Sequence, residues 1–427
     1  MKVAFCTLGC KVNQYESQSM EQALIKRGFE CVGASEEADV YIVNSCTVTA
    51  ESDRKTRQNV RHLRKLHPDA VIVLTGCMPQ AFPEDARLLT QADIVTGNRS
   101  NKQIPDMIDE FFRTRERIVR IAQHENGEKF SGELINDFRE RTRATVKIED
   151  GCNRFCSYCV IPYARGRVRS KPLEDIREEI SSLEKKGFSE IVLVGINLSA
   201  YGTDCGASIC DAVELAASFD GIKRVRLGSL EPDHMTPDVT KRLAECKKLC
   251  PQFHISLQSG CDKTLKRMNR HYTAAEYEEL CTRLRSEFED ATLTTDVMVG
   301  FSGETKEDFE ISCDFVKKIG FEKVHVFPYS RRAGTRAAEF PDVVENAEKE
   351  RRSREMIAAA GEVRHEFLER QIGRTVEVLF EEKLRDGSIQ GYTANYTPVR
   401  IKSGCTHGLR KVKITACGDD WCEGELV

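Results

Sequence analysis

The sequence predicts an α/β protein with an N-terminal domain on a parallel sheet, a central partial (βα)6 barrel and a small C-terminal β-barrel. Two patterns indicate this architecture. Short aliphatic and β-branched runs alternate with amphipathic segments in two successive series, as in parallel sheets that are covered by helices. The C-terminal stretch then holds only short β-type runs, which favours a small barrel. A chain of 427 residues also exceeds what one ordinary core organises.

The expected domain boundaries follow these changes of pattern. The N-terminal domain covers residues 1–113, a charged linker 114–140, the central barrel 141–370 and the C-terminal domain 371–427. In the first domain we expect strands at 2–5, 40–43, 71–74 and 92–95. Helices are expected from Asn13, as the cap, to Lys26 and over residues 50–66.

The second series predicts six βα units. Expected strands cover residues 144–148, 190–194, 223–227, 253–257, 293–299 and 323–327, with helices at 173–186, 274–288 and 306–318. Enzymes of this architecture place their sites at the C-terminal ends of the strands. A mixed-charge helix over 344–370, expected to have a solvated face, leads to strands at 375–380, 389–393, 399–402 and 411–415.

Composition restricts the compartment and the partners. The formal net charge is -4, so a nucleic-acid surface must be a local patch. The opening MKVAFCTLGC lacks the features of a signal peptide, and no window approaches about eighteen apolar residues, so we expect a cytoplasmic protein without a membrane span. In a reducing compartment the 18 cysteines are not expected to form disulfides, which leaves buried apolar positions, metal ligands and catalytic thiols.

A loop with C-x3-C-x2-C spacing follows the first barrel strand and contains Cys152, Cys156 and Cys159. Three thiolates on one tight loop can bind three irons of a four-iron cube and leave the fourth iron open to a small-molecule chelate. Zinc is the competing metal, but structural zinc takes four ligands in paired spacings, and no fourth Cys or His is close in sequence. Burial of all three thiols in one core is the other alternative, which their position on a single loop disfavours.

A second set of cysteines is spread over the N-terminal domain, one after each of its first three expected strands: Cys10, Cys46 and Cys77. Because the loops that follow parallel strands gather at one sheet edge, these thiols can meet there. Gly9 and Gly76 permit the backbone turns that this requires. From spacing alone, coincidental buried cysteines remain the alternative, and Cys6 is interpreted as a strand-end core residue.

Seven segments together resemble the methylthiotransferase family of radical-SAM enzymes. They are TLGCKVNQYES, VNSCTVTAESDRKTRQ, VLTGCMPQ, KIEDGCNRFCSYCVIPYARGRVRSKP, HISLQSGCDKTLKRMNRHYTA, TTDVMVGFSGET and HVFPYSRRAGTRAAEF, which span nearly the whole chain. The resemblance implies two [4Fe-4S] clusters, an auxiliary one on Cys10, Cys46 and Cys77 and a radical-generating one on the later triad. It implies that S-adenosyl-L-methionine chelates the open iron of the later cluster and yields a 5′-deoxyadenosyl radical.

The opening TLGCKVNQYES and the segment ARGRVRSKP are most similar to the MtaB-like branch of that family. This branch adds a methylthio group to C2 of N6-threonylcarbamoyladenosine in the anticodon loop of tRNA, and it needs an electron donor protein or reductant. Sister branches act on isopentenyladenosine in tRNA or on an aspartate of a ribosomal protein. The alternative from another class is a non-catalytic iron–sulfur redox sensor that binds RNA. The sulfur donor is not identified by the sequence.

Polar residues at the ends of the barrel strands are candidates for the S-adenosylmethionine or substrate pocket: Asn197, Glu231, Ser256, Gln258 and Asp296. The alternative is that they satisfy buried backbone groups or cap helices. Tyr158 stands before the last cysteine of the loop, at a position that the family usually fills with an aromatic residue near the adenine. Simple packing of the loop is the alternative for its ring.

Two basic clusters are candidates for RNA contact. We expect the one after the radical loop to bind the RNA backbone: Arg165, Arg167, Arg169 and Lys171. The other is interpreted as a solvated helix face: Arg54, Lys55, Arg57, Arg61, Arg64 and Lys65. The C-terminal barrel resembles a TRAM domain, an RNA-binding module. Residues 371–427 hold eight Lys and Arg against eight Asp and Glu, so this assignment depends on the resemblance and not on charge.

The sequence departs from the family pattern in two loops at the barrel rim. Ser302 stands where the family has proline in Phe-Pro-Gly-Glu. Arg331 and Ala333 replace both prolines of Tyr-Ser-Pro-Arg-Pro-Gly-Thr. Loss of proline enlarges the conformational freedom of a loop, so we expect looser loops with every proposed ligand retained.

Overall fold

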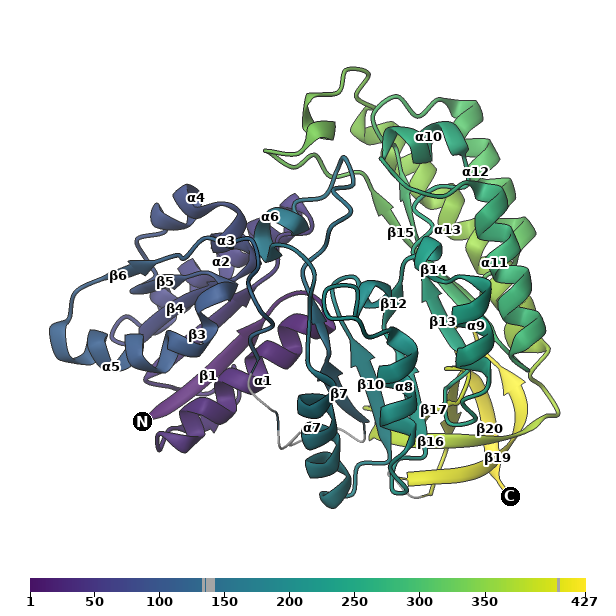
Figure 1. Cartoon of the computed structure of the whole chain (residues 1–427), viewed down its shortest axis with the longest axis horizontal. Coiled ribbons are helices and arrows are strands. Elements are labelled where there is room, and N and C mark those ends of the chain that lie inside the picture. Colours follow the sequence, from purple (N-terminus) through teal and green to yellow (C-terminus); the bar gives the residue numbers. More distant parts are fainter. Residues whose placement is uncertain (133–134, 136–142, 405–407) are drawn as a thin grey trace.

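The structure, a computed structural model, describes residues 1–132, 135, 143–404 and 408–427. It contains a parallel α/β domain at the N-terminus, a central partial barrel and a closed β-barrel at the C-terminus (Figure 1). The predicted fold class is therefore confirmed. None of the described helices is both long and apolar enough to cross a membrane.

The N-terminal domain is built on a six-stranded sheet in which every neighbouring pair is parallel. Its order is β2 (Glu30–Val32), β1 (Lys2–Thr7), β3 (Val40–Ser45), β4 (Val71–Gly76), β5 (Ile94–Thr96) and β6 (Ile118–Arg120). The four expected strands are present. Strands β2 and β6 were not predicted, because three residues at a sheet edge carry little periodic pattern.

Strand β6 lies within the stretch that the sequence analysis assigned to the linker, and it extends the sheet by pairing with β5. Residues 133–134 and 136–140 of that stretch lie outside the described part of the chain.

Helices cover both faces of this sheet: α1 (Lys11–Lys26), α2 (Ala50–Leu66), α3 (Cys77–Ala81), α4 (Pro83–Arg87), η1 (Asn98–Gln103) and α5 (Ile104–Thr114). One core joins Met20 of α1 and Met107 of α5 to Ile42 of β3. The other core joins Val60 of α2 to Val43 of the same strand. Because β3 faces a core on each side, it is an unbroken apolar run until Asn44.

The first helix begins at Lys11, so the prediction that Asn13 caps it is wrong. Cys10 occupies the N-cap position without a side-chain cap bond. The Asn13 amide is instead buried and donates to the carbonyl oxygens of Leu8 and Ser45, each at 2.9 Å. It thereby ties the loop after β1 to the loop after β3, which carry Cys10 and Cys46.

The central barrel consists of two parallel sheets. The first has the order β11 (Arg224–Leu227), β10 (Glu190–Val194) and β7 (Arg143–Lys147). The second has the order β12 (Ser229–Leu230), β13 (Gln252–Ile255), β14 (Thr292–Val299) and β15 (Lys323–Pro328). All six expected strands are present, and one apolar core spans both sheets. Among the described strands none joins β7 to β15, so the barrel is open on that side.

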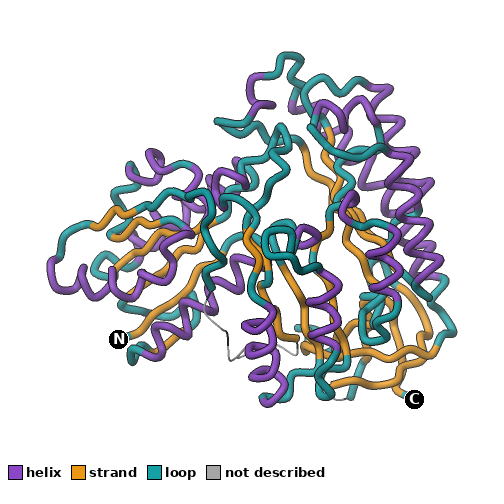
Figure 2. The backbone as a smooth tube through the Cα atoms, in the orientation of Figure 1, coloured by secondary structure: helices purple, strands orange, loops and turns teal. Residues whose placement is uncertain are grey.

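Helices line the outside of the barrel strands (Figure 2). They are α7 (Leu173–Lys185), α8 (Ile209–Ala217), α9 (Pro237–Ala244), α11 (Ala274–Glu287), α12 (Lys306–Ile319) and α13 (Asn346–Glu369). The short helix α10 (Asp262–Arg267) lies beyond the C-terminal ends of the strands (Figure 1). Short 3-10 turns interrupt the connections: η2 (Leu198–Ala200), η3 (Pro232–His234) and η4 (Arg336–Glu339). Helix α13 keeps one solvated face, as expected, while Met356 on its other face enters the barrel core.

The C-terminal domain is a closed five-stranded barrel: β16 (Thr375–Lys383), β17 (Ile389–Thr393), β18 (Pro398–Ile401), β20 (Cys422–Leu426) and β19 (Gly408–Cys417). Its interior holds Val378, Phe380, Val399 and Val412. The first four strands in the chain were predicted, and β20 was missed because its sequence, CEGEL, alternates weakly.

Arginines of the central-barrel strands attach the small barrel. Arg226, with a side chain only 2% exposed, donates to the carbonyl oxygens of Ala394 and Thr393 at 3.0 and 3.4 Å. Its Nε also donates to Glu190 at 3.0 Å, and its guanidinium lies 4.8 Å from the ring centre of Tyr396. One buried cation therefore links strands β10 and β11 to the loop after β17.

We expect Arg226→Met to lower the free energy of unfolding by about 3–5 kcal/mol, because the change leaves Glu190 buried with weaker partners and removes one donor from each of the Ala394 and Thr393 carbonyl groups. Thermal unfolding and limited proteolysis around residue 394 would measure this effect. The matched control is Arg374→Met, whose partner Asp290 is 45% exposed and whose loss should cost about 0–1 kcal/mol. Equal effects of the two changes would contradict this account of the domain interface.

Candidate active site

The C-x3-C-x2-C loop lies at the C-terminal ends of the barrel strands, after β7 and the two-residue strand β8 (Glu149–Asp150). It is followed by α6 (Ile161–Arg165) and β9 (Arg169–Ser170), which pairs with β8. Gly151 opens the loop with φ +88°, and a Cβ there would lie 2.0 Å from the Arg167 carbonyl oxygen. Only glycine fits this position, because both the conformation and the space exclude a side chain.

The three thiols of this loop interact with one another and with three nitrogen donors, one of which is the Arg154 amide at 3.5 Å from Cys152 Sγ. Burial raises the pKa of Cys152 to about 12, and the neighbouring Cys156 adds to the shift. Burial and the same neighbour also raise the pKa of Cys159. Arg270 donates to Cys156 Sγ at 3.2 Å, and the side-chain nitrogen of Asn197 lies 3.9 Å from Cys152 Sγ. Buried thiols that resist ionisation in the free protein become thiolates when a metal binds them.

Later parts of the chain clamp the loop in place. Ser157 donates through its amide to the Met268 carbonyl at 2.9 Å and through Oγ to the Arg267 carbonyl at 2.8 Å. Asn269 donates to the carbonyl of Phe155 at 3.2 Å. The Ala337 amide donates to the Ser157 carbonyl at 2.7 Å. The loop is therefore positioned by the end of α10 and by η4, far away in sequence.

Two of the predicted pocket residues lie directly beside the triad. Asn197 is buried, and its Oδ1 has no hydrogen-bond partner among the described residues. Glu231 pairs with Arg270, the residue that contacts Cys156. A buried acceptor without a donor, beside three thiols and a fixed guanidinium, fits a polar ligand that carries its own donor groups.

The other predicted pocket residues lie further round the strand ends. Gln258 has φ +65° and accepts the Met298 amide at 2.8 Å, and its own amide donates to the Asp296 carbonyl at 2.8 Å. The Asp296 carboxylate lies 3.3 Å from His254 Nε2. Ser256 uses its carbonyl to accept the hydroxyl of Tyr272 at 2.8 Å.

Tyr158 packs its ring edge-on against Phe301, with ring centres 6.2 Å apart. Of the two interpretations given for Tyr158, this contact agrees with simple packing of the loop.

The second cysteine triad lies where strands β1, β3 and β4 end. Gly9 has φ +110°, and a Cβ there would lie 2.8 Å from the Cβ of Cys46. Gly76 has φ +98°, and a Cβ there would lie 2.5 Å from the Ser45 carbonyl oxygen. The two glycines thus let three loops approach closely enough to share one site. Cys6 instead packs beside the apolar core of the sheet, as expected.

The thiols of this triad share one environment. Asn13 Oδ1 lies 3.7 Å from Cys10 Sγ and 4.0 Å from Cys77 Sγ. Burial raises the pKa of Cys77 to about 12, with Cys46 and Cys10 contributing. In the described chain, no three Cys, His, Asp or Glu side chains converge on a single-ion site. A four-iron cube binds its cysteines at separate corners, so it does not require the three sulfurs to converge on one ion.

The structure corrects the RNA-binding prediction for the cluster after the radical loop. Arg165, Arg169 and Lys171 are buried, and Arg167 alone is exposed. Lys171 pairs with the buried Glu179, and Arg169 lies 3.4 Å from Asp150. Their segment runs along the interface between the first two domains, so these charges are paired inside the protein and cannot reach a phosphate. Spacing in the sequence could not separate buried from exposed arginines.

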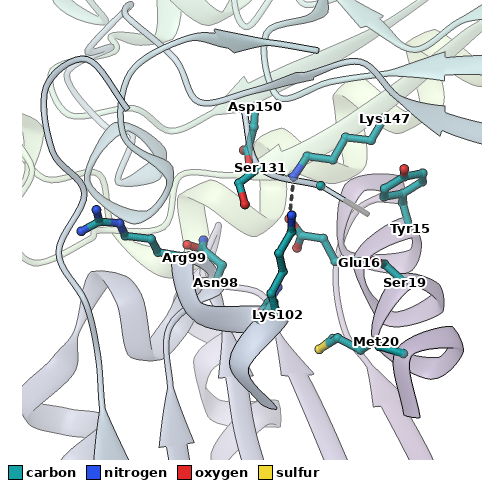
Figure 3. Close-up of a pocket in the computed structure, with 13 residues that line it drawn as sticks. Tyr15, Glu16, Ser19, Met20, Asn98, Arg99, Lys102, Ser131, Lys147 and Asp150 are labelled. Atoms are coloured by element: carbon teal, nitrogen blue, oxygen red, sulfur yellow. Dashed lines mark hydrogen bonds and ion pairs between the residues drawn. The ribbon is translucent and has the colours of Figure 1, made fainter. Parts of the chain in front are cut away.

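A buried ion network at this interface was missed by the sequence analysis. Lys147 Nζ lies 2.8 Å from Glu16 and 2.7 Å from Asp150 (Figure 3). Arg165 contacts both carboxylates and donates through Nε to Cys77 Sγ at 3.3 Å. A cavity of about 60 Å³ adjoins the network between α1, η1 and β7. The sequence offered one indication of this network: Lys147 and Asp150 lie at the end of a strand that was expected to be buried.

The loop at the barrel rim that lacks prolines is anchored by contacts with the N-terminal domain. Arg332 is buried and donates to Asp53 at 2.5 Å and to Thr47 Oγ1 at 2.8 Å. Ser330 Oγ accepts the Ala50 amide at 3.0 Å. These contacts supply restraint that the missing prolines do not.

Comparison with known proteins agrees with this arrangement. Residues 2–97 match the uncharacterized protein family UPF0004, and residues 146–316 match the radical SAM superfamily. The chain is 35% identical to the threonylcarbamoyladenosine tRNA methylthiotransferase MtaB of Bacillus subtilis, over 100% of this chain and 96% of that protein. The MtaB of Thermotoga maritima is 37% identical over 99% and 96%. The chain belongs to the radical-SAM tRNA methylthiotransferase family.

Membership has direct consequences for cofactors and activity. The protein is an enzyme of this family, with tRNA as its substrate class, two [4Fe-4S] clusters and S-adenosylmethionine. A relative of another named activity is nearly as similar. The tRNA-2-methylthio-N(6)-dimethylallyladenosine synthase of Carboxydothermus hydrogenoformans is 36% identical over 99% of this chain and 98% of its own. Family membership therefore leaves the target base open.

A solved structure shares the fold at low identity. The radical S-adenosylmethionine methyltransferase TsrM of Kitasatospora setae, with cobalamin and a [4Fe-4S] cluster bound, aligns with TM-score 0.56 and 14% identity. The alignment covers 77% of this chain and 72% of that one, so the pairing of an α/β domain with a radical-SAM barrel is shared.

We expect Gly151→Ala to reduce the iron content of anaerobically reconstituted protein by about half, because the added Cβ displaces the loop that carries one of two four-iron sites. Iron and protein assays would measure this. Gly187→Ala is the matched control, since its φ of +87° is similar but nothing lies within 4 Å of its Cβ. That variant should lose about 1–2 kcal/mol of stability and no iron. Full iron content in Gly151→Ala would show that the loop tolerates a side chain.

Proposed function

We propose that this enzyme adds a methylthio group to C2 of N6-threonylcarbamoyladenosine in the anticodon loop of tRNA. The observation that carries the proposal is the end-to-end similarity to relatives named for that activity, together with the opening TLGCKVNQYES and the segment ARGRVRSKP. Methylthiolation of isopentenyladenosine in tRNA is the second candidate, favoured by the relatives named for the dimethylallyl nucleoside.

We assign the cysteines to two ligand sets. Cys152, Cys156 and Cys159 would hold the radical-generating cluster, and Cys10, Cys46 and Cys77 the auxiliary cluster. Each set offers three thiols, which leaves one iron of a cube open. When bound, these clusters and S-adenosylmethionine would supply the electron, the radical and the sulfur that an unactivated C2–H bond requires. The protein contributes the positions of the sulfurs and their hydrogen-bond donors.

The mouth of the barrel would receive S-adenosylmethionine. The unpaired Oδ1 of Asn197 can accept a hydrogen bond from an amino or hydroxyl group of the ligand. Arg270 pairs with the half-buried Glu231; burial raises the pKa of this carboxyl, and the Arg270 cation opposes the shift. Gln258, Asp296 and Tyr158 would complete the pocket wall, with the Tyr158 ring held by Phe301.

The RNA surface would combine three exposed elements. Arg167 stacks on Phe155, at 4.5 Å from its ring centre, beside the radical loop. The exposed face of α2 carries Arg54, Lys55 and Arg61. The TRAM-like barrel presents Trp421 with Arg400 at 3.7 Å from the ring centre. Such cation and aromatic pairs suit unstacked loop nucleotides better than a duplex.

The remaining assignments complete this proposal. We place the domain boundaries at 1–113, 141–370 and 371–427, with residues 114–140 between the first two domains. An electron donor protein or another reductant acts with the enzyme in the cytoplasm. The sulfur donor is a separate, unidentified component.

Deleting the gene should abolish 2-methylthio-threonylcarbamoyladenosine in tRNA and leave the methylthio derivative of isopentenyladenosine unchanged. Mass spectrometry of tRNA nucleosides would measure both, with the plasmid-borne gene as the rescue control. The reverse pattern would assign this chain to the second candidate function.

The two triads should have separable chemistry. Replacing Cys10, Cys46 and Cys77 by alanine should leave about four of about eight irons and retain reductive cleavage of S-adenosylmethionine, because no ligand of the barrel cluster changes. The variant should make no methylthio product, since the sulfur has lost its anchoring site. Cys156→Ala should stop both reactions. Methylthio product at the wild-type rate from the triple variant would reduce the auxiliary site to a structural role.

A further inference from the structure

The segment that follows the radical loop carries the charged side chain that reaches the auxiliary triad. Arg165 ends α6, six residues after Cys159, yet its guanidinium enters the N-terminal domain. Its side chain is 0% exposed, and Nε donates to Cys77 Sγ at 3.3 Å. Asn98, from the N-terminal domain itself, lies further from the same sulfur, at 3.8 Å.

Every nitrogen of this guanidinium has an acceptor. One terminal nitrogen lies 2.6 Å from Glu16 Oε1 and 3.2 Å from Asp150 Oδ1. The other lies 2.8 Å from Asn13 Oδ1 and 2.9 Å from Glu16 Oε2. A planar group held at three nitrogens by partners from two domains cannot rotate away from the sulfur.

The charges around Arg165 allow it to remain buried. The carboxylates of Glu16 and Asp150 face three cations, Arg165, Lys147 and Arg169. Arg169 also lies 3.7 Å from Glu128, so these three cations have three carboxylates around them without the cysteines. The Nε–H of Arg165 is directed at Cys77.

We propose that Arg165 is a positioning residue for the auxiliary cluster, which donates a charge-assisted hydrogen bond to Cys77 and sets the electronic properties of that cluster from the radical-SAM domain. The inference rests on the ligand set given under the proposed function. Hydrogen bonds to the sulfurs of a cluster stabilise its more negative, reduced form and raise its potential. Because α6 continues from the radical loop, this bond also connects the two cluster sites.

The test isolates the auxiliary cluster by replacing Cys152, Cys156 and Cys159 with alanine. This background also removes the cluster near Arg270 and Arg154, which contact the proposed ligands Cys156 and Cys152. In this variant Arg165 itself is not substituted. When the protein is labelled with 15N-arginine, pulsed electron paramagnetic resonance of the reduced cluster should detect magnetic coupling to the nitrogen of Arg165. Absence of the coupling in a cluster-loaded sample would overturn the proposal.

Two charge-conserving changes then separate an electronic role from a structural one. Arg165→Lys keeps the cation but loses the fixed Nε donor, so the auxiliary potential should become more negative and the nitrogen coupling should disappear. Lys147→Arg is the matched control, since Lys147 is also buried in this network, and its ammonium contacts two carboxylates and the Phe130 ring instead of a proposed cluster ligand. An unchanged potential in Arg165→Lys with full iron content, or an equal shift in both variants, would overturn the proposal.

The iron content of the background variant shows whether a negative result contradicts this inference alone or also the proposed function on which it rests. A background variant that holds about four irons per chain supports the proposed ligand set, whatever the nitrogen coupling shows. A background variant with no iron would refute the assignment of Cys10, Cys46 and Cys77, and with it this inference. If Arg165→Lys fails to assemble, the labelled background protein still decides the matter.

Discussion

The buried network of Glu16, Lys147, Asp150 and Arg165 is the interaction on which the arrangement of the two proposed cluster sites depends. Each member comes from a different element, α1, β7, β8 or α6, so the network requires both domains to be folded and docked. Removing one charge leaves an opposite charge buried without compensation, which is far more costly than loss of a surface pair. This mutual dependence holds the edge of the N-terminal sheet against the open side of the barrel.

Parallel sheet geometry explains why two such sites can face each other. In both domains the chain leaves each strand at its C-terminal end, and the ligand-bearing loops gather there. Three separate loops deliver the first triad, whereas one loop delivers the second. The first arrangement needs Gly9 and Gly76 for close approach, and the second needs Gly151 for a turn against the Arg167 carbonyl. An open barrel leaves one side available for the N-terminal domain to dock.

Residues that lie next to the cysteines in space divide into two kinds. Asn197 and Glu231 were predictable, because polar side chains at the ends of apolar strands stand out in a sequence. Three other residues were not predictable, because each lies in a segment whose charged residues resemble those of a solvent-exposed surface: Glu16, Arg165 and Arg270. Arg165 was even assigned to RNA, since a cluster of arginines after the radical loop looks like a basic patch. In the folded protein the N-terminal domain buries Arg165, so its guanidinium binds protein groups instead of RNA.

The sequence by itself determined the order of elements, the three-part architecture, the family and the two cysteine triads. These features depend on local periodicity and on motifs, which neighbouring residues encode. Tertiary structure alone decided the edge strands β2 and β6, the start of α1 at Lys11 and the paired charges at the domain interface. It also decided which arginines reach solvent. The physical reason is that the cost of burying a charge depends on the partners that folding brings to it, and those partners lie up to 285 residues away in the chain, as Thr47 does from Arg332.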